Sequence, residues 1–135
     1  MDTKTLEGRN ILLAISRSET QPRIAAAAAA LVGIVPRVAV VVPDEAAWRG
    51  LIGQHGWEGA YHVAVERVDA VVALERNGRV GRGVYSLVTE ALAQHRPAFA
   101  LRRGADQKPR LVEIVAARES GAADWTNDFG ILRAA

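Results

Sequence analysis

Five short apolar runs, separated by stretches of helical or loop character, constrain the fold of this chain more than any other feature. The central runs are uniformly apolar, which is typical of strands that are buried on both faces. The runs lie at 10–16, 37–42, 69–75, 98–103 and 111–117. Because strands that alternate with helices form a parallel sheet between two helical layers, we expect an α/β fold of the three-layer, Rossmann-like class. The expected sheet is mainly parallel and five-stranded, with the flavodoxin-like strand order 2-1-3-4-5.

The segments between these runs carry signals for helices. The alanine-rich stretch 22–33 follows the capping-box sequence SETQ, and Asp44 is a candidate N-cap for a short helix. A glycine-broken loop is expected over 54–62, and the clearest helix over 83–96, where apolar residues recur with helical spacing. The tail 123–132 is predicted to form a last short helix.

The bulk composition is that of a globular protein. The chain has 135 residues, of which 50% are hydrophobic and 24% charged, so we expect a single Rossmann-like domain over 1–135. It has no cysteine, which excludes disulfides and thiolate metal sites. The longest uncharged apolar run, 24–36, is shorter than the roughly 20 residues that span a membrane, and the first residues lack a signal-peptide pattern. We therefore expect a cytoplasmic protein without a membrane partner.

Two familiar kinds of site do not fit the residue spacing. His55, His62 and His95 have no metal-binding spacing, so neither a metal nor a cofactor is expected. Gly78 and Gly83 have the spacing of a P-loop, but Val84 follows where that motif needs a lysine. Hydrolysis of a nucleoside triphosphate by a P-loop is therefore not expected.

An arginine- and glycine-rich segment, LERNGRVGRGVYSLVTEAL at 74–92, follows the third predicted strand. A glycine turn between a strand and a helix exposes backbone N–H groups, and the helix start adds partial positive charge. In the flavodoxin-like order, ligands bind between the first and third strands, outside their carboxyl ends. The sequence therefore predicts an anion site for a phosphate or ribose phosphate. The candidate ligand-binding residues are Ser16, Arg17, Ser18, Glu75, Arg79, Gly81, Arg82, Gly83 and Tyr85.

Four of these candidates have an alternative structural interpretation. Ser16 and Ser18 could instead serve as a strand end and a helix cap. Glu75 could instead form an ion pair with a nearby arginine (Arg76, Arg79 or Arg82). Tyr85 could line the pocket or a contact between subunits.

The run 69–102 resembles the core of the nucleoside 2-deoxyribosyltransferase group and its relatives, the LOG-type nucleotide phosphoribohydrolases. Asp69 opens the strand, Gly83-Val84 stand at a G-[TV] pair, and Arg96-Pro97 at a basic-Pro pair. The resemblance implies a Rossmann-like fold, a nucleotide or nucleoside phosphate as ligand, and chemistry at an N-glycosidic bond. These families have a catalytic glutamate four residues after the glycine, where this chain has Leu87. Glu90 faces away from the sheet at helical spacing, so no catalytic residue is assigned.

Three functions stay open from the sequence. The first is a nucleotide- or nucleoside-phosphate-binding domain, as a sensor, a regulatory binder or an N-glycosidic-bond enzyme. The second is a basic nucleic-acid-binding protein, because residues 76–103 hold six arginines and one carboxylate. The third is a structural subunit of a homo-oligomer without catalysis, with contact faces on helices 22–33 and 83–96. A homo-oligomer is also expected if the chain is a nucleotide- or nucleoside-phosphate-binding domain.

Overall fold

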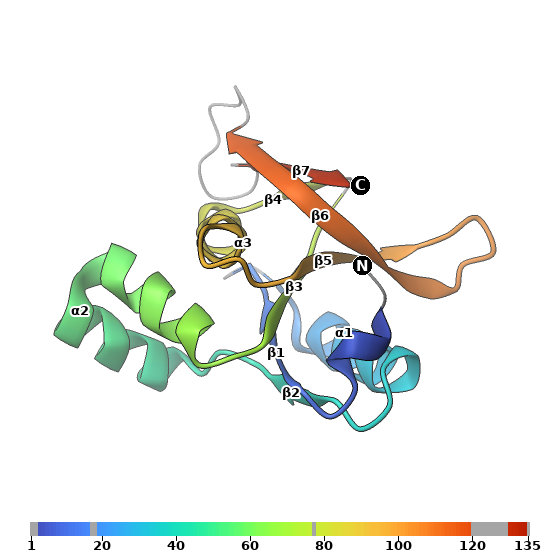
Figure 1. The fold of residues 1–135 in the computed structure, drawn as a ribbon, viewed down its shortest axis with the longest axis horizontal. Helices are drawn as coiled ribbons and strands as arrows, with labels where there is room; N and C mark the ends of the chain where they lie inside the picture. Colours follow the sequence, from blue (N-terminus) through green and yellow to red (C-terminus); the bar gives the residue numbers. More distant parts are fainter. Residues whose placement is uncertain (1–2, 17–18, 77, 120–129, 135) are drawn as a thin grey trace.

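The computed structural model describes residues 3–16, 19–76, 78–119 and 130–134 (Figure 1). Its helices are α1 (Gln21–Ile34), α2 (Glu45–Glu66) and α3 (Arg82–Ala93), with a short 3-10 turn, η1 (Thr3–Leu6). Its strands are β1 (Asn10–Ala14), β2 (Ala39–Val41), β3 (Ala70–Leu74), β4 (Arg79–Val80), β5 (Ala98–Arg103), β6 (Pro109–Glu119) and β7 (Gly130–Ala134). Of the helices in these ranges, none combines the length and the apolar character that crossing a membrane requires.

The strands form one mixed sheet in the order β2-β1-β3-β5-β6-β7-β4. The strands β2, β1, β3 and β5 are parallel to one another. Next in the sheet come β6, β7 and β4, each antiparallel to the strand before it. The α/β class is therefore confirmed, and the five predicted strands keep their predicted relative order. The predicted strand count and complete order are wrong, because β7 and the two-residue strand β4 extend the sheet beyond β6.

One further local prediction is wrong, and another is contradicted only where the structure describes it. Residues 54–62 are not a loop but part of α2, which is kinked where Gly56 has a φ of 74° and a ψ of 176°. Burial of Ala60 and Val65 holds the second half of this helix in place. The tail helix predicted over 123–132 falls largely outside the described residues, and Gly130–Ala134 is a strand.

The core has one cluster on each face of the parallel strands. On one face, α1 buries Ile24, Ala27 and Leu31 against the sheet. On the other face, α3 buries the predicted stripe of Val84, Leu87, Val88 and Ala91. This stripe forms because the four apolar residues recur at intervals of three and four, which places them on one side of a helix.

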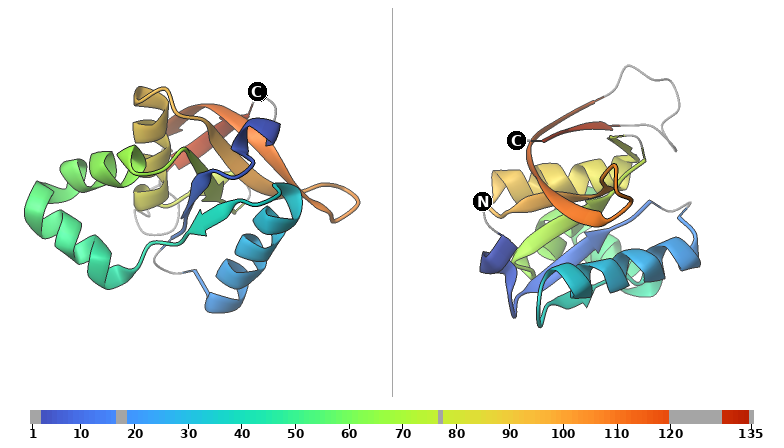
Figure 2. Two further views of the ribbon diagram at one scale, coloured as in Figure 1. Left: turned by 60° about the horizontal axis from the view of Figure 1, so that its bottom comes forward. Right: turned by 90° about the vertical axis from the view of Figure 1, so that its right-hand side faces the viewer.

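The ribbon of β6, β7 and β4 encloses α3 from the side opposite the parallel strands. Figures 1 and 2 show α3 between the two layers, with β6 curving from one to the other. Ile114 of β6, Leu132 of β7 and Val80 of β4 join the same apolar cluster as the α3 stripe. A register shift between Ile114 and Ala116 marks a bulge in β6, a feature that bends strands. The helix is therefore covered on two sides by one continuous sheet.

Tyr85 of α3 packs directly on Gly130 of β7. A substitution at this contact tests whether the ribbon encloses α3. A Cβ atom at position 130 would lie 3.0 Å from Cγ of Tyr85 and closer still to Cδ2. We expect Gly130→Ala to lower the free energy of unfolding by about 1–3 kcal/mol, because the ring or the strand must move. Denaturant unfolding measures this change.

The matched control for this substitution is Gly50→Ala in α2, where an added Cβ meets nothing within 4 Å. This control should raise stability by about 0.4–1 kcal/mol. In the double variant Gly130→Ala/Tyr85→Ala, the loss of free energy of unfolding should be smaller than the sum of the losses in the two single variants. Additive losses would contradict the contact.

Candidate functional site

The segments after β1 and β3 lie side by side, as the sequence predicts. The two strands are parallel neighbours, with Leu12 opposite Val71. Beyond their carboxyl ends, Nη2 of Arg76 lies 3.4 Å from Oε1 of Glu19. Ser16 is half-buried, and its carbonyl oxygen accepts a hydrogen bond from the Glu19 amide at 3.1 Å. Arg17 and Ser18 lie outside the described residues.

The glycine segment after β3 is a tight hairpin. The amides and carbonyls of Arg76 and Arg79 bond to each other, at 3.0 and 2.9 Å, around Gly78 with a φ of 77°. The Gly78 carbonyl accepts the Leu132 amide at 3.0 Å. The backbone N–H groups of Arg76 and Arg79 are thus engaged within the turn.

The remaining predicted residues belong to the start of α3. Gly81 is the buried N-cap, Arg82 is exposed, and Gly83 lies near the hydroxyl of Tyr61 from α2. Tyr85 is occupied by its packing on Gly130. These residues are on the α3 side of the sheet.

An open groove of about 510 Å³ lies on the opposite face, between α1 and the carboxyl ends of β3 and β5. Within the described chain, α1 is the only long helix on this face, so the sheet beside it is only partly covered. The lining residues are Arg23, Ala26, Ala27, Ala30, Leu74, Glu75, Gly78, Leu101, Arg102, Arg103 and Pro109. The groove therefore combines small and apolar side chains with three arginines and one carboxylate.

Glu75 is fixed at the groove by Arg102. The Glu75 side chain is only 6% exposed, and Nε and Nη2 of Arg102 donate to its two oxygens, the latter at 3.2 Å. The hydrogen bond to Glu75 raises the pKa of Arg102, partial burial opposes this shift, and the carboxylate charge adds to it. Because the pKa in the folded state is raised, the stabilisation from Arg102 is present throughout the neutral range and is lost only in strong alkali. The partner of Glu75 is thus Arg102, from the neighbouring strand, rather than an arginine of its own loop.

Glu19 holds a second arginine at the groove. Its side chain is 3% exposed and accepts from Nη1 of Arg23 at 3.0 Å through both oxygens. The Thr20 amide donates to the same carboxylate at 3.1 Å. Arg23 on α1 is therefore held at one side of the groove, opposite Arg102 on β5.

The sequence analysis missed the arginines that line this groove. Arg103 is exposed and donates from Nη1 to the carbonyl of Gln107 at 2.8 Å. Arg102 and Arg103 end a parallel strand, and ligands of α/β folds bind outside the carboxyl ends of strands. That position in the run 98–103 was the signal that could have marked them.

The positions that correspond to catalytic residues in the families that 69–102 resembles lie away from the groove. Leu87, at the position of their glutamate, is 5% exposed within the core. Glu90 faces α2, where its Oε1 lies 2.6 Å from Nδ1 of His62. Glu66 lies 3.1 Å from the other ring nitrogen of His62. Among the described residues, no three His, Asp or Glu side chains are grouped so that they could hold a metal ion.

Comparison with protein-family models, with curated proteins and with solved structures finds no match to this chain.

Breaking the pair of Glu75 and Arg102 tests whether it fixes the groove. We expect Glu75→Gln to lower the free energy of unfolding by about 1–3 kcal/mol, because a charged hydrogen bond in a nearly buried site is lost. Chemical denaturation measures the change. In a double-mutant cycle with Arg102→Met, the double variant should lose less stability than the sum of the two single losses.

The exposed pair of Glu45 and Arg49, 2.8 Å apart, is the control. Glu45→Gln should change stability by less than about 0.5 kcal/mol. Equal effects of Glu75→Gln and Glu45→Gln would show that the Glu75 pair has no special structural role.

Proposed function

We propose that this protein binds a small anionic ligand, a nucleotide or nucleoside phosphate, in the groove between α1 and the ends of β3 and β5. The observation that carries the proposal is the convergence of Arg23, Arg102 and Arg103 on one open groove of about 510 Å³. Guanidinium groups are the preferred partners of phosphate, because their planar fork of N–H donors matches phosphate oxygens.

The arginines retain donors for a ligand although they are already positioned by the protein. Each guanidinium has five N–H donors. Arg102 uses Nε and Nη2 for Glu75, and Arg103 uses Nη1 for a carbonyl. An anion can therefore add to these groups without breaking the contacts that orient them, and pre-positioned groups lose less entropy on binding.

The rest of the groove suits the uncharged part of such a ligand. Ala26, Ala27 and Ala30 of α1 line one side, and Leu74 and Leu101 contribute the apolar part of the sheet. A site with an apolar lining and a few polar groups is typical for ligands of this size. The resemblance of 69–102 to nucleotide-handling families supports the same ligand class.

Binding without turnover agrees best with the residues present. The position of the family glutamate is the buried Leu87, and the carboxylate at the groove, Glu75, is held by Arg102. We propose a sensor or regulatory binder rather than an N-glycosidic-bond enzyme. Incubation with a nucleotide panel and chromatographic detection of free base checks this, and release of base would overturn the non-catalytic part alone.

A thermal-shift screen of nucleosides and nucleoside phosphates tests binding at the groove. A ligand that binds only the folded state stabilises it by about 2.7 kcal/mol at 100 times its Kd, which raises Tm by several degrees. We expect this rise with phosphorylated ligands. It should disappear in Ala26→Trp, where the ring fills the groove, and weaken in Arg103→Gln.

The control is Ala25→Trp, which adds the same ring to an exposed α1 position that does not line the groove. Its ligand response should equal that of the unchanged protein. The proposal would be contradicted if no phosphorylated ligand raised Tm. It would also be contradicted if both tryptophan variants lost the ligand-induced rise in Tm equally.

A homo-oligomer is a second candidate, favoured by the outer face of α1. Residues 24–36 contain no charged side chain, and Ala25, Ala29 and Val32 are exposed, Val32 by 55%. A helix that is apolar on all sides is usually buried on all sides. A second copy of the chain would cover this face.

Light scattering coupled to size-exclusion chromatography tests the oligomer. Ala29→Glu places a charge in the middle of the apolar face, and we expect it to convert an oligomer to the monomer. Ala47→Glu, at an exposed position of α2, should leave the mass unchanged. A monomeric unchanged protein, or an equal effect of both substitutions, would rule out this interface.

A further inference from the structure

We propose that the outer face of the ribbon of β6, β7 and β4 binds the phosphate backbone of double-stranded nucleic acid through Arg79, Arg118 and Arg133. This set of arginines is termed the ribbon face. It is separate from the groove, since none of the three lines the groove.

The strand register places the three arginines on one face. Paired residues in an antiparallel ladder point to the same side, and sides alternate along each strand. Ala117 pairs with Leu132, and both pack toward α3, so the neighbouring pair of Ala116 and Arg133 points outward. Arg118 and Arg79 both pair with position 131, from opposite sides of β7, and share this outward direction.

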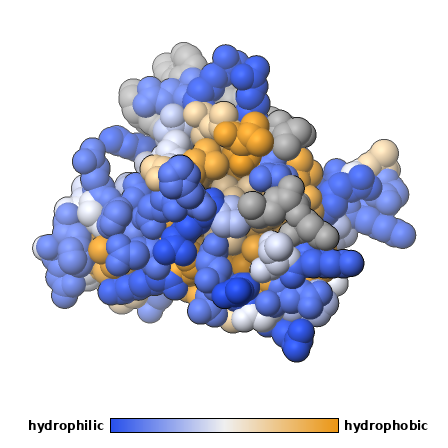
Figure 3. Space-filling view, in the orientation of Figure 1, coloured by the Kyte–Doolittle hydropathy of each residue, from blue (hydrophilic) through white to orange (hydrophobic). Residues whose placement is uncertain are grey.

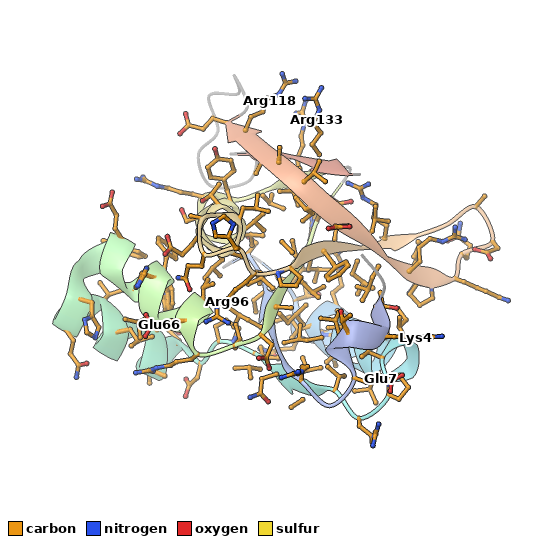
Figure 4. All side chains as sticks on the ribbon, viewed as in Figure 1. Lys4, Glu7, Glu66, Arg96, Arg118 and Arg133 are labelled. Carbon is orange, nitrogen blue, oxygen red and sulfur yellow. The ribbon has the colours of Figure 1, made fainter. Side chains whose placement is uncertain are left out.

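Arg118 and Arg133 are close neighbours on this face. They are diagonal partners in the ladder, which corresponds to roughly 7–8 Å between them, and together they border a small hollow with Ala116 and Ala117. Figure 4 shows the two side chains next to each other at the outer side of the ribbon. All three arginines are exposed.

The charge of this pair is not neutralised within the described part of the chain. Arg23, Arg76 and Arg102 are each paired with a glutamate. Arg118 and Arg133, in contrast, have no hydrogen bond or ion pair with any described residue, although like charges at neighbouring ladder positions repel. Two adjacent exposed arginines without an ion-pair partner among the described residues form a positively charged patch that fits an anionic partner.

The shape and composition of the ribbon favour a duplex over other polyanions. Arg118 and Arg133 belong to the β6–β7 pair, which is a two-stranded antiparallel segment, and a segment of this kind fits the major groove of a duplex between two phosphate backbones. Binding of single strands uses aromatic side chains, and the described outward positions of the ribbon have none. A membrane surface would need an apolar face with several large side chains. Among the ribbon residues whose burial the structure describes, only Val115 is an exposed large apolar residue, and Figure 3 shows apolar and hydrophilic residues mixed over the upper part of the molecule.

The salt dependence of binding gives a quantitative expectation. Each phosphate contact contributes about −0.9 to the slope of log K against log salt concentration, so three contacts predict a slope of about −2.7. Loss of two arginines should reduce the slope to about −0.9 and weaken binding on the order of tenfold per arginine at low salt.

Fluorescence anisotropy with a labelled mixed-sequence DNA duplex of about 20 base pairs, between about 25 and 200 mM salt, tests the proposal. The variant is Arg118→Gln/Arg133→Gln, and the control is Arg9→Gln/Arg67→Gln. The control removes the same charge from exposed positions outside the ribbon. Circular dichroism confirms that each variant is folded, and Arg118→Lys/Arg133→Lys should retain most of the binding.

The proposal is supported if Arg118→Gln/Arg133→Gln binds the duplex more weakly and with a shallower salt dependence, while the control variant does not. It is overturned if the protein does not bind the duplex, or if ribbon and control variants weaken equally. Binding that is tighter to single-stranded DNA or to vesicles of anionic phospholipid than to the duplex also overturns it. Groove variants such as Ala26→Trp should leave duplex binding unchanged, which separates this result from the nucleotide test.

Discussion

A sharp reversal of the chain between β5 and β6 is the constraint on which both candidate surfaces depend. The hairpin is closed by the Gly104 amide, which donates to the Lys108 carbonyl at 3.0 Å, and by the Gln107 amide, which donates to Gly104 at 2.9 Å. Doubly wound folds continue with helices that cover both faces of the sheet. Here β5 leads directly into β6, and within the described residues α1 is left without a second long helix beside it. The groove lies where that helix would pack, and the freed strand β6 curves over α3 to form the ribbon.

The enclosure of α3 also determines what this helix can do. Its apolar stripe contacts the parallel strands and the ribbon, so Leu87 is a packing residue, whereas the families that the run 69–102 resembles have a catalytic carboxylate at the corresponding position. A glutamate at that position would be buried between two layers of apolar side chains, at a large desolvation cost. The arrangement therefore favours a binding role for the charged edge of the sheet.

The sequence predicts the parts of the fold that depend on local pattern. The strands β1, β2, β3, β5 and β6 and their relative order follow from apolar periodicity and the rules for parallel sheets, as do the α3 stripe and the proximity of the segments after β1 and β3. The loop predicted at 54–62 fails because three nearby glycines suggest a break, although only Gly56 has a positive φ and the others are helical. The strands β4 and β7 and the pairing of Glu75 with Arg102 could not be predicted, since they depend on contacts between distant segments. For the same reason the site prediction included Glu75 but missed the arginines of α1 and β5.

We propose that the phosphorylated ligand binds in the groove rather than at the glycine hairpin and the start of α3. Titration of the isotope-labelled protein with a nucleoside monophosphate, followed by two-dimensional NMR of the backbone amides, tests it most directly. If the ligand binds in the groove, chemical-shift changes will concentrate at Ala26, Ala30, Leu74 and 101–103. Changes confined to 79–85, or no changes at all, would contradict it.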